Sequence, residues 1–155
     1  MFKVASLFCG LGGSDLGILG GFTFLGHFYP RLFFDIVFAV DLDKHAVETY
    51  NKNFAHQAVC ADVNDIDFTK IPQVDVLVGG FPCQAFSIAG KRGGFDDTRG
   101  TIFFDFARIM KAKKPKFAIF ENVKGLLNHD GGKTYETMLR TLDELGYNAQ
   151  WGILN

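Results

Sequence analysis

The stretch KVASLFCGLGG, Lys3–Gly13, decides the expected fold. Lys3–Phe8 is mostly apolar and predicts a buried first strand, and a turn with three glycines follows it directly. A dinucleotide-binding GxGxxG motif would need its third glycine at position 15, where this chain has Asp15. NAD or FAD is therefore disfavoured, and a strand-to-helix turn that binds no ligand stays an alternative.

Short apolar runs alternate with helical periodicity along the rest of the chain. Further strands are expected at Ile36–Val40, Val74–Val78, Phe117–Phe120 and Ala149–Leu154, with a weak one near Ala58–Ala61. Helices are expected at Asp43–Phe54, Thr101–Lys113 and Thr134–Leu145, the last with Thr134 as N-cap and Gly146 as its stop. This alternation predicts an α/β domain with a Rossmann-like, mostly parallel sheet and helices on both faces, and no domain boundary within residues 1–155.

Composition excludes several classes of protein. Of the 155 residues, 48% are hydrophobic and 21% charged, as expected for a folded domain. No apolar run approaches the roughly 18 residues that a membrane span needs, and the N-terminal run is too short for a signal peptide. The net charge of −1 gives no general attraction to polyanions, so any contact with nucleic acid needs a local basic patch or further chain.

The three cysteines are Cys9, Cys60 and Cys83. Their odd number and wide spacing argue against disulfides and against a metal site, and they favour a cytoplasmic location. Cys9 and Cys60 are interpreted as structural residues. Cys83 directly follows Pro82 at the end of an apolar run, and the glycine-rich stretch after it carries three basic residues, so Cys83 is a candidate nucleophile.

Acidic residues follow the predicted strands, at the edge where open parallel sheets bind ligands. Asp41 is suited to accept hydrogen bonds from a ribose diol, with Leu42 against an adenine face, and Asp62, followed by Val63, is suited to accept from an adenine amino group. The alternatives are helix capping by Asp41, for which Asp43 competes, and an ordinary turn at Asp62. Together these residues indicate an adenosine-containing ligand without a phosphate cradle, such as S-adenosylmethionine.

Glu121 follows the apolar run Phe117–Phe120. A carboxyl group there is expected to be partly desolvated and suited to hold or donate a proton; the alternative is an ion pair with a lysine such as Lys116 or Lys124. Asn122 is expected to orient the neighbouring backbone. Cys83 and Glu121 on adjacent strand ends would form a pair for attack on an electron-poor ring.

Four motifs resemble the DNA cytosine-5 methyltransferases of bacterial restriction–modification systems. They are SLFCGLGG at Ser6–Gly13, GFPCQAFS at Gly80–Ser87, RGTIF at Arg99–Phe103 and ENV at Glu121–Val123. Their order and spacing match over almost the whole chain, and the PCQ and ENV pair is the most specific part. The transfer-RNA cytosine methyltransferases are the nearest look-alike, but FPCQAFS is similar to the DNA-acting branch.

The resemblance implies a covalent mechanism on a cytosine flipped out of double-stranded DNA. Cys83 would attack carbon 6, Glu121 would contact ring nitrogen 3 and the exocyclic amine, and Pro82 would shape the floor of the site. The loop Ser87–Gly100, which includes Ser87 and Arg99, would close over the base, and Gln84 just before it would belong to the substrate side of the site. The residues implied for S-adenosylmethionine are Phe8, Gly10, Leu11, Gly12, Asp41, Leu42, Asp62 and Val63.

Three features depart from the family pattern. Ser6 stands where the family usually has Asp, which is expected to loosen the methionine end of the cofactor site, and Asp41 stands where it usually has Glu. The segment between Gly13 and Asp41 is longer than usual and rich in aromatic residues. It is expected to pack into the core as a helix and turn, with an exposed partner surface as the alternative.

The chain also lacks the arginine-rich catalytic motif, the target-recognition domain and the C-terminal helix that the resemblance implies. It is therefore expected to be a fragment, a truncated product or one subunit of a split enzyme whose second polypeptide carries the missing parts. An S-adenosylmethionine-binding remnant without catalysis is the alternative. The strand expected at Ala149–Leu154 would then lack its pairing partner or pair with another chain.

Overall fold

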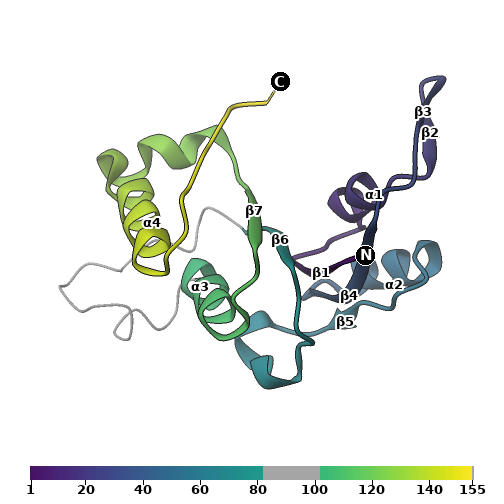
Figure 1. The fold of residues 1–155 in the computed structure, drawn as a ribbon, viewed down its shortest axis with the longest axis horizontal. Helices are drawn as coiled ribbons and strands as arrows, with labels where there is room; N and C mark the ends of the chain where they lie inside the picture. Colours follow the sequence, from purple (N-terminus) through teal and green to yellow (C-terminus); the bar gives the residue numbers. More distant parts are fainter. Residues whose placement is uncertain (82–101, 155) are drawn as a thin grey trace. The chain divides into compact units, whose positions relative to one another are not determined.

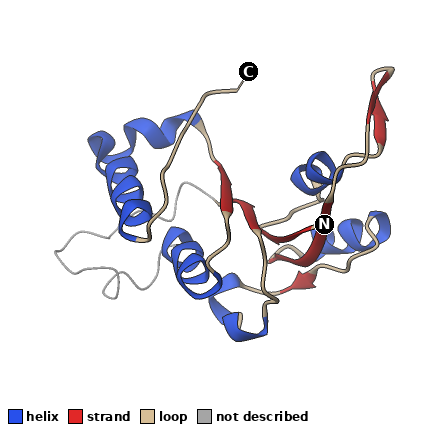
Figure 2. Ribbon diagram, in the orientation of Figure 1, coloured by secondary structure: helices blue, strands red, loops and turns tan. Residues whose placement is uncertain are grey.

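The computed structural model describes residues 1–81 and 102–154, and it divides into two compact units. The first unit holds Met1–Gly80 and Lys113–Phe120, and the second holds the remaining described residues. Figures 1 and 2 show the ribbon coloured by sequence and by secondary structure. No helix of the described residues is both long enough and apolar enough to cross a membrane.

A five-stranded sheet forms the centre of the first unit, with the strand order β5-β4-β1-β6-β7 (Figure 1). The strands are β1 (Phe2–Leu7), β4 (Phe34–Asp41), β5 (Val59–Cys60), β6 (Val76–Gly80) and β7 (Phe117–Glu121). β1 is parallel to β4 on one side and to β6 on the other, and β4 is parallel to β5. The mostly parallel sheet expected from the sequence is thus confirmed.

Two helices, α1 (Gly13–Leu19) and α2 (Lys44–Asn53), pack on one face of this sheet. The helices contribute Ile18, Leu19, Val47 and Tyr50 to a core shared with the strand residues Val4, Ile36, Ala39, Val76 and Val78. On β1, Ala5 and Leu7 are buried as well. Both faces of the central strand are therefore shielded from water, as an α/β sheet requires.

The aromatic segment after α1 forms a hairpin, so the expected core-packed helix and turn is wrong. β2 (Phe22–Phe24) pairs antiparallel with β3 (His27–Tyr29) (Figure 2). Gly20 and Gly21 have φ of +62° and +82°, which end the helix, and a Cβ on Gly20 would lie 2.0 Å from the backbone oxygen of Pro30. The exposed apolar side chains here are Phe24, Leu25, Phe28, Tyr29, Leu32 and Phe33.

The described part of the second unit contains α3 (Ile102–Lys113), the 3-10 segment η5 (Lys124–Gly132) and α4 (Lys133–Glu144). The expected N-cap at Thr134 is wrong, because Gly132 occupies that position in a left-handed conformation and the Thr134 hydroxyl lies 2.7 Å from the His129 ring. The expected stop at Gly146 is confirmed: its φ is +84° and its N–H donates to the Asp143 carbonyl.

No strand forms at Ala149–Leu154, so that expected element is wrong (Figure 2). The segment is exposed, and the side chain of Leu154 is 96% accessible. The Trp151 ring makes an edge contact with Tyr135 of α4. No strand among the described residues pairs with this segment, and the expectation that it pairs with another chain stays a prediction.

Candidate active site

The glycine turn after β1 forms one side of the candidate site. The N–H of Cys9 donates to the Val40 carbonyl at 3.1 Å, which ties the turn to the end of β4. Phe8, Gly10 and Gly12 all have positive φ. A Cβ on Gly10 would meet nothing within 4 Å, whereas a Cβ on Gly12 would lie 2.2 Å from the Phe54 ring. Gly10 therefore leaves open space beside the backbone, while Gly12 allows the turn to pack closely on α2.

Asp41 at the end of β4 contacts the glycine turn directly. Its Oδ2 accepts a hydrogen bond from the N–H of Gly10 at 2.8 Å, and its Oδ1 accepts from the N–H of Asp43 at 2.9 Å. A carboxylate offers about four acceptor positions, so each oxygen can still accept one further hydrogen bond. The sequence prediction that the turn and Asp41 meet at one sheet edge is thus confirmed.

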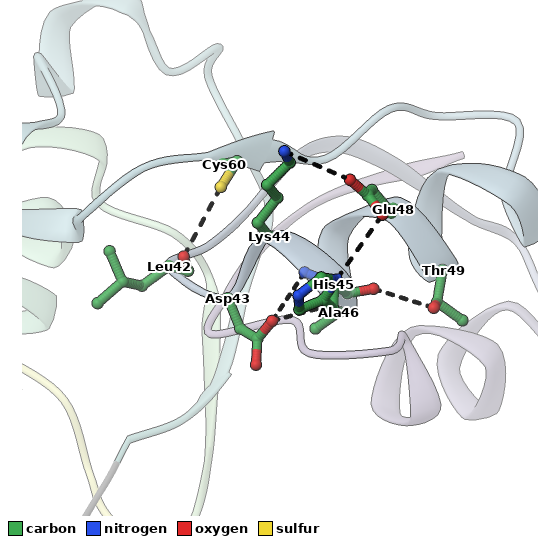
Figure 3. A network of polar contacts seen from close by, with 8 residues as sticks. All are labelled: Leu42, Asp43, Lys44, His45, Ala46, Glu48, Thr49 and Cys60. Atoms are coloured by element: carbon green, nitrogen blue, oxygen red, sulfur yellow. Dashed lines mark hydrogen bonds and ion pairs between the residues drawn. The ribbon is translucent and has the colours of Figure 1, made fainter.

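Asp43, and not Asp41, caps helix α2. Its Oδ1 accepts from the N–H groups of His45 and Ala46 at 2.8 and 3.1 Å (Figure 3). These backbone hydrogen bonds lower the pKa of Asp43, because they favour the ionised carboxylate. Since Asp43 caps the helix, the Asp41 carboxylate is available to accept the hydrogen bond from the glycine turn.

Asp62 follows β5 and caps the short 3-10 helix η1 (Val63–Asp65). Its Oδ1 accepts from the backbone N–H and side-chain amide of Asn64, both at 2.8 Å. Its Oδ2 has no hydrogen-bond donor among the described residues, while Val63 behind it is buried. The Ala61 N–H donates to the Asp41 carbonyl, which joins this segment to β4.

Two apolar side chains at this edge are open to solvent. Leu42 is 67% exposed and Leu11 is 63% exposed. Figure 3 shows the Leu42 side chain extending away from the polar contacts at the start of α2. The candidate cofactor residues therefore combine acceptors, open backbone and exposed apolar surface within the first unit.

Asp15 is a buried polar residue whose role the sequence did not predict. It is 0% exposed and accepts hydrogen bonds from the Ser6 and Tyr50 hydroxyls at 2.6 and 2.7 Å. Ser6 is therefore turned into the core, where it contacts a carboxylate. An acidic residue in the first turn of a helix is visible in the sequence. The sequence does not indicate that Asp15 is buried, because its two hydrogen-bond partners are remote in the chain.

The described cysteines differ in environment. Cys9 is buried, and desolvation raises its pKa to about 12, with the negative charges of Asp15 and Asp41 adding to the rise. The structural interpretation of Cys9 is thus confirmed. Cys60 is exposed because β5 is a two-residue edge strand, so the same interpretation is wrong for it. Its sulfur lies 3.7 Å from the Leu42 carbonyl oxygen.

Asn122 in the second unit anchors the backbone that precedes the candidate nucleophile. Its Nδ2 donates to the Phe81 carbonyl at 2.7 Å, and its Oδ1 accepts from the Val123 N–H at 2.9 Å. The buried Phe81 ring packs 6.0 Å from the rings of Phe103 and Phe106. These two hydrogen bonds are what the predicted role of Asn122 in orienting the neighbouring backbone requires, and that role stays a prediction.

Glu121 is exposed, so its expected desolvation is wrong. Side chains alternate along β7, and Glu121 shares the exposed side with Phe117 and Ile119. Five further candidates lie outside the described residues: Pro82, Cys83, Gln84, Ser87 and Arg99. Their predicted roles stay predictions.

The strand order, the glycine turn and the acidic residue after β4 define a Rossmann-like α/β protein with a candidate ligand site at the carboxyl ends of its strands. The model of the family "C-5 cytosine-specific DNA methylase" matches residues 2–155, and the chain belongs to this family.

Curated relatives agree with this assignment. The chain is 49% identical to the type II methyltransferase M1.ScrFI of Lactococcus lactis subsp. cremoris over 148 residues, which are 96% of this chain and 35% of that relative. It is 44% identical to M.NlaX of Neisseria lactamica, covering 99% of this chain and 46% of the relative. The chain thus spans less than half the length of these relatives.

The fold is shared with solved structures. The crystal structure of a DNMT2 mutant of Spodoptera frugiperda matches with a TM-score of 0.66 at 24% identity, over 94% of this chain and 41% of that one. DNMT2 of S. pombe matches with a TM-score of 0.62 at 21% identity. At these identities the likeness shows the fold alone.

Proposed function

We propose that this chain is the N-terminal catalytic portion of a DNA (cytosine-5) methyltransferase of the restriction–modification type, with S-adenosylmethionine as methyl donor. The observation that carries the proposal is the family match over residues 2–155, together with the contact of the glycine turn with Asp41 at the ligand-binding edge of the sheet. The target-recognition part would come from further chain or a second polypeptide. The widely spaced cysteines support a cytoplasmic location.

The residues of the first unit fit an adenosyl group chemically. Asp41 keeps acceptor positions for the two hydroxyls of a ribose, and Asp62 keeps Oδ2 for an adenine amino group. The exposed Leu42 offers an apolar surface for a planar ring. The remaining residues proposed to line the cofactor are Phe8, Gly10, Leu11, Gly12 and Val63. When bound, S-adenosylmethionine would supply an electrophilic methyl group.

By the family resemblance, Cys83 and Glu121 would supply the groups that activate the cytosine. The Cys83 thiolate adds to carbon 6, and a hydrogen bond from Glu121 to ring nitrogen 3 stabilises the negative charge that the ring takes up. Carbon 5 would then have the electron density to accept the methyl group, whose bond to the sulfonium sulfur would break and leave S-adenosylhomocysteine. Loss of the carbon 5 proton to a base restores the double bond and expels the thiolate, which leaves 5-methylcytosine and unmodified Cys83.

Asn122 supports this assignment for the nucleophile. Its hydrogen bond to the Phe81 carbonyl fixes the residue immediately before Pro82 and Cys83, and the aromatic packing of Phe81 fixes it further. A nucleophile loses less conformational entropy on attack when the residues next to it are already held in place.

Calorimetry of the chain with S-adenosylmethionine tests the cofactor assignment. Asp62→Ala should weaken binding about tenfold, because it removes a hydrogen bond to a charged acceptor. Asp67→Ala is the matched control, since Asp67 caps the next 3-10 helix, η2 (Phe68–Lys70), through the same contact to a backbone N–H and lies outside the proposed site. Equal affinities of the two variants would contradict the assignment.

Duplex DNA with 5-fluorocytosine at the target position tests catalysis, with the missing polypeptide supplied. Fluorine at carbon 5 cannot leave as a proton does, so a covalent adduct should accumulate. It should vanish in Cys83→Ser and persist in Cys60→Ser, the matched control. Binding of S-adenosylmethionine without any adduct would support a binding module without catalysis, and an adduct with RNA alone would support the transfer-RNA alternative.

A further inference from the structure

A buried carboxylate behind the glycine turn has no part in the proposed chemistry. Asp15 lies in the first turn of α1 and is fully buried. Its Oδ1 accepts a hydrogen bond from the Ser6 hydroxyl of β1 at 2.6 Å, and its Oδ2 accepts from the Tyr50 hydroxyl of α2 at 2.7 Å. These three residues, called here the carboxylate cluster, join the three elements whose ends surround the glycine turn.

Stability alone does not account for this cluster. A carboxylate loses much hydration free energy when it is buried, and apolar side chains of similar volume often stabilise a core as well or better. Desolvation is the largest influence on Asp15 and raises its pKa, although both hydroxyl hydrogen bonds act in the opposite direction. A group buried at this cost is therefore a candidate for a geometric role.

The cluster reaches the glycine turn through Tyr50. The Tyr50 ring stacks on the Phe54 ring with centroids 4.3 Å apart. The Phe54 ring in turn fills the space beside Gly12, where a Cβ would lie 2.2 Å away. Because the Tyr50 hydroxyl is hydrogen-bonded to Asp15, the stacked rings of Tyr50 and Phe54 are held in position against Gly12.

The other side of the turn is held independently. The Gly10 N–H donates to Asp41 Oδ2 at 2.8 Å, and the Gly12 N–H donates to the Cys9 carbonyl at 2.8 Å. The backbone from Gly10 to Gly12 therefore lies between two supports, Asp41 on one side and the carboxylate cluster on the other. Loss of either support would let the turn move relative to Asp41.

We propose that Asp15 is a positioning residue, which holds the glycine turn in the shape that binds the cofactor by tying Ser6 and Tyr50 to one carboxylate. This inference rests on the proposed binding of S-adenosylmethionine. Asp15 acts through its two partners and the turn, because it is fully buried and has no surface open to a ligand.

Two substitutions of Asp15 separate the effect of its hydrogen bonds from the effect of its negative charge. Asp15→Ala removes both bonds and should weaken S-adenosylmethionine binding about tenfold or more in calorimetry. Asp15→Asn has the same shape, with one oxygen to accept from one hydroxyl and an amide to donate to the other, and should bind within about threefold of the parent chain. Ile36→Val, a small apolar change in the same core, should leave the affinity unchanged and controls for lost stability.

Amide hydrogen exchange without ligand gives a second readout. Exchange at the Gly10 and Gly12 amides should be about tenfold faster in Asp15→Ala and unchanged in Asp15→Asn and Ile36→Val. Parent-like affinity and exchange in Asp15→Ala would overturn the proposal. So would an Asp15→Asn variant as impaired as Asp15→Ala, because the amide keeps the hydrogen bonds.

If Asp15→Ala fails to fold, two further variants test whether Asp15 positions the glycine turn. Ser6→Ala and Tyr50→Phe each remove one hydroxyl, and each should speed exchange at Gly12; no change in either would overturn the proposal. Failure of the parent chain to bind S-adenosylmethionine would refute the proposed function instead, while the exchange rates would still decide whether Asp15 positions the turn.

Discussion

Among glycine-to-alanine substitutions in the glycine turn, Gly12→Ala should lower the free energy of unfolding most. The new Cβ would lie 2.2 and 2.5 Å from two atoms of the Phe54 ring and 3.0 Å from the Tyr50 ring. The φ of +91° adds backbone strain that a non-glycine residue rarely tolerates. Overpacking costs about 1–3 kcal/mol and a left-handed residue about 1–2 kcal/mol, so we expect a loss of about 2–5 kcal/mol.

Urea unfolding followed by circular dichroism measures this loss, with two neighbouring glycines as controls. Gly10 has φ of +53° but open space around its Cβ position, so Gly10→Ala should show the backbone strain alone. Gly13 has open space and is not among the residues with positive φ, so Gly13→Ala should change stability by less than about 1 kcal/mol.

A double substitution isolates the steric part. Phe54→Ala removes the ring that Gly12→Ala would strike, so Gly12→Ala should cost at least about 1 kcal/mol less in the Phe54→Ala background than in the parent chain. A Gly12→Ala variant as stable as Gly13→Ala, or additive effects at positions 12 and 54, would refute the steric reasoning.

Three further outcomes are expected. The hydrogen bond from the Lys3 N–H to the Asp75 carboxylate lowers the pKa of Asp75 below its ordinary value of 3.8. The ionised carboxylate therefore stabilises the fold at pH values above 3.8. This stabilisation is lost as the pH falls through the lower pKa of the folded state. The urea midpoint of the parent chain should therefore fall more steeply below about pH 4 than that of Asp75→Asn. Thiol alkylation mapped by mass spectrometry should modify Cys60 and spare Cys9, whose pKa is raised to about 12; equal labelling would contradict the burial of Cys9. Leu25→Ser should change the free energy of unfolding by less than about 0.5 kcal/mol because Leu25 is 89% exposed, and a larger loss would mean that the hairpin is packed.

The sequence predicted the five strands of the sheet because the central strands are rich in apolar residues, although the strand expected at Ala149–Leu154 does not form. It also placed the glycine turn and Asp41 together, since the ends of parallel strands share one edge. It failed at the hairpin, where strands of three residues with exposed aromatic side chains show no alternation between a polar and an apolar side. There the conformation is set by glycines of positive φ, and hydrophobicity gives no guide.

Buried hydrogen bonds between residues remote in the chain could not be predicted from the sequence either. Nothing in the pattern around Asp15 indicates a serine nine positions before it and a tyrosine 35 positions after it as partners. The cap of α4 was misplaced for a related reason, because Thr134 lies against His129 and a glycine ends the preceding segment. Such contacts depend on tertiary packing, which local propensity does not encode.

The position of β1 between β4 and β6 has a consequence for synthesis on the ribosome. β1 leaves the exit tunnel first and can pair with β4 early, but its other edge must wait until Val76–Gly80 has been translated. At roughly 5–20 residues per second, that edge stays open for about a few seconds. A nascent chain stalled in this interval carries an unpaired apolar strand, the kind of surface that holdase chaperones bind.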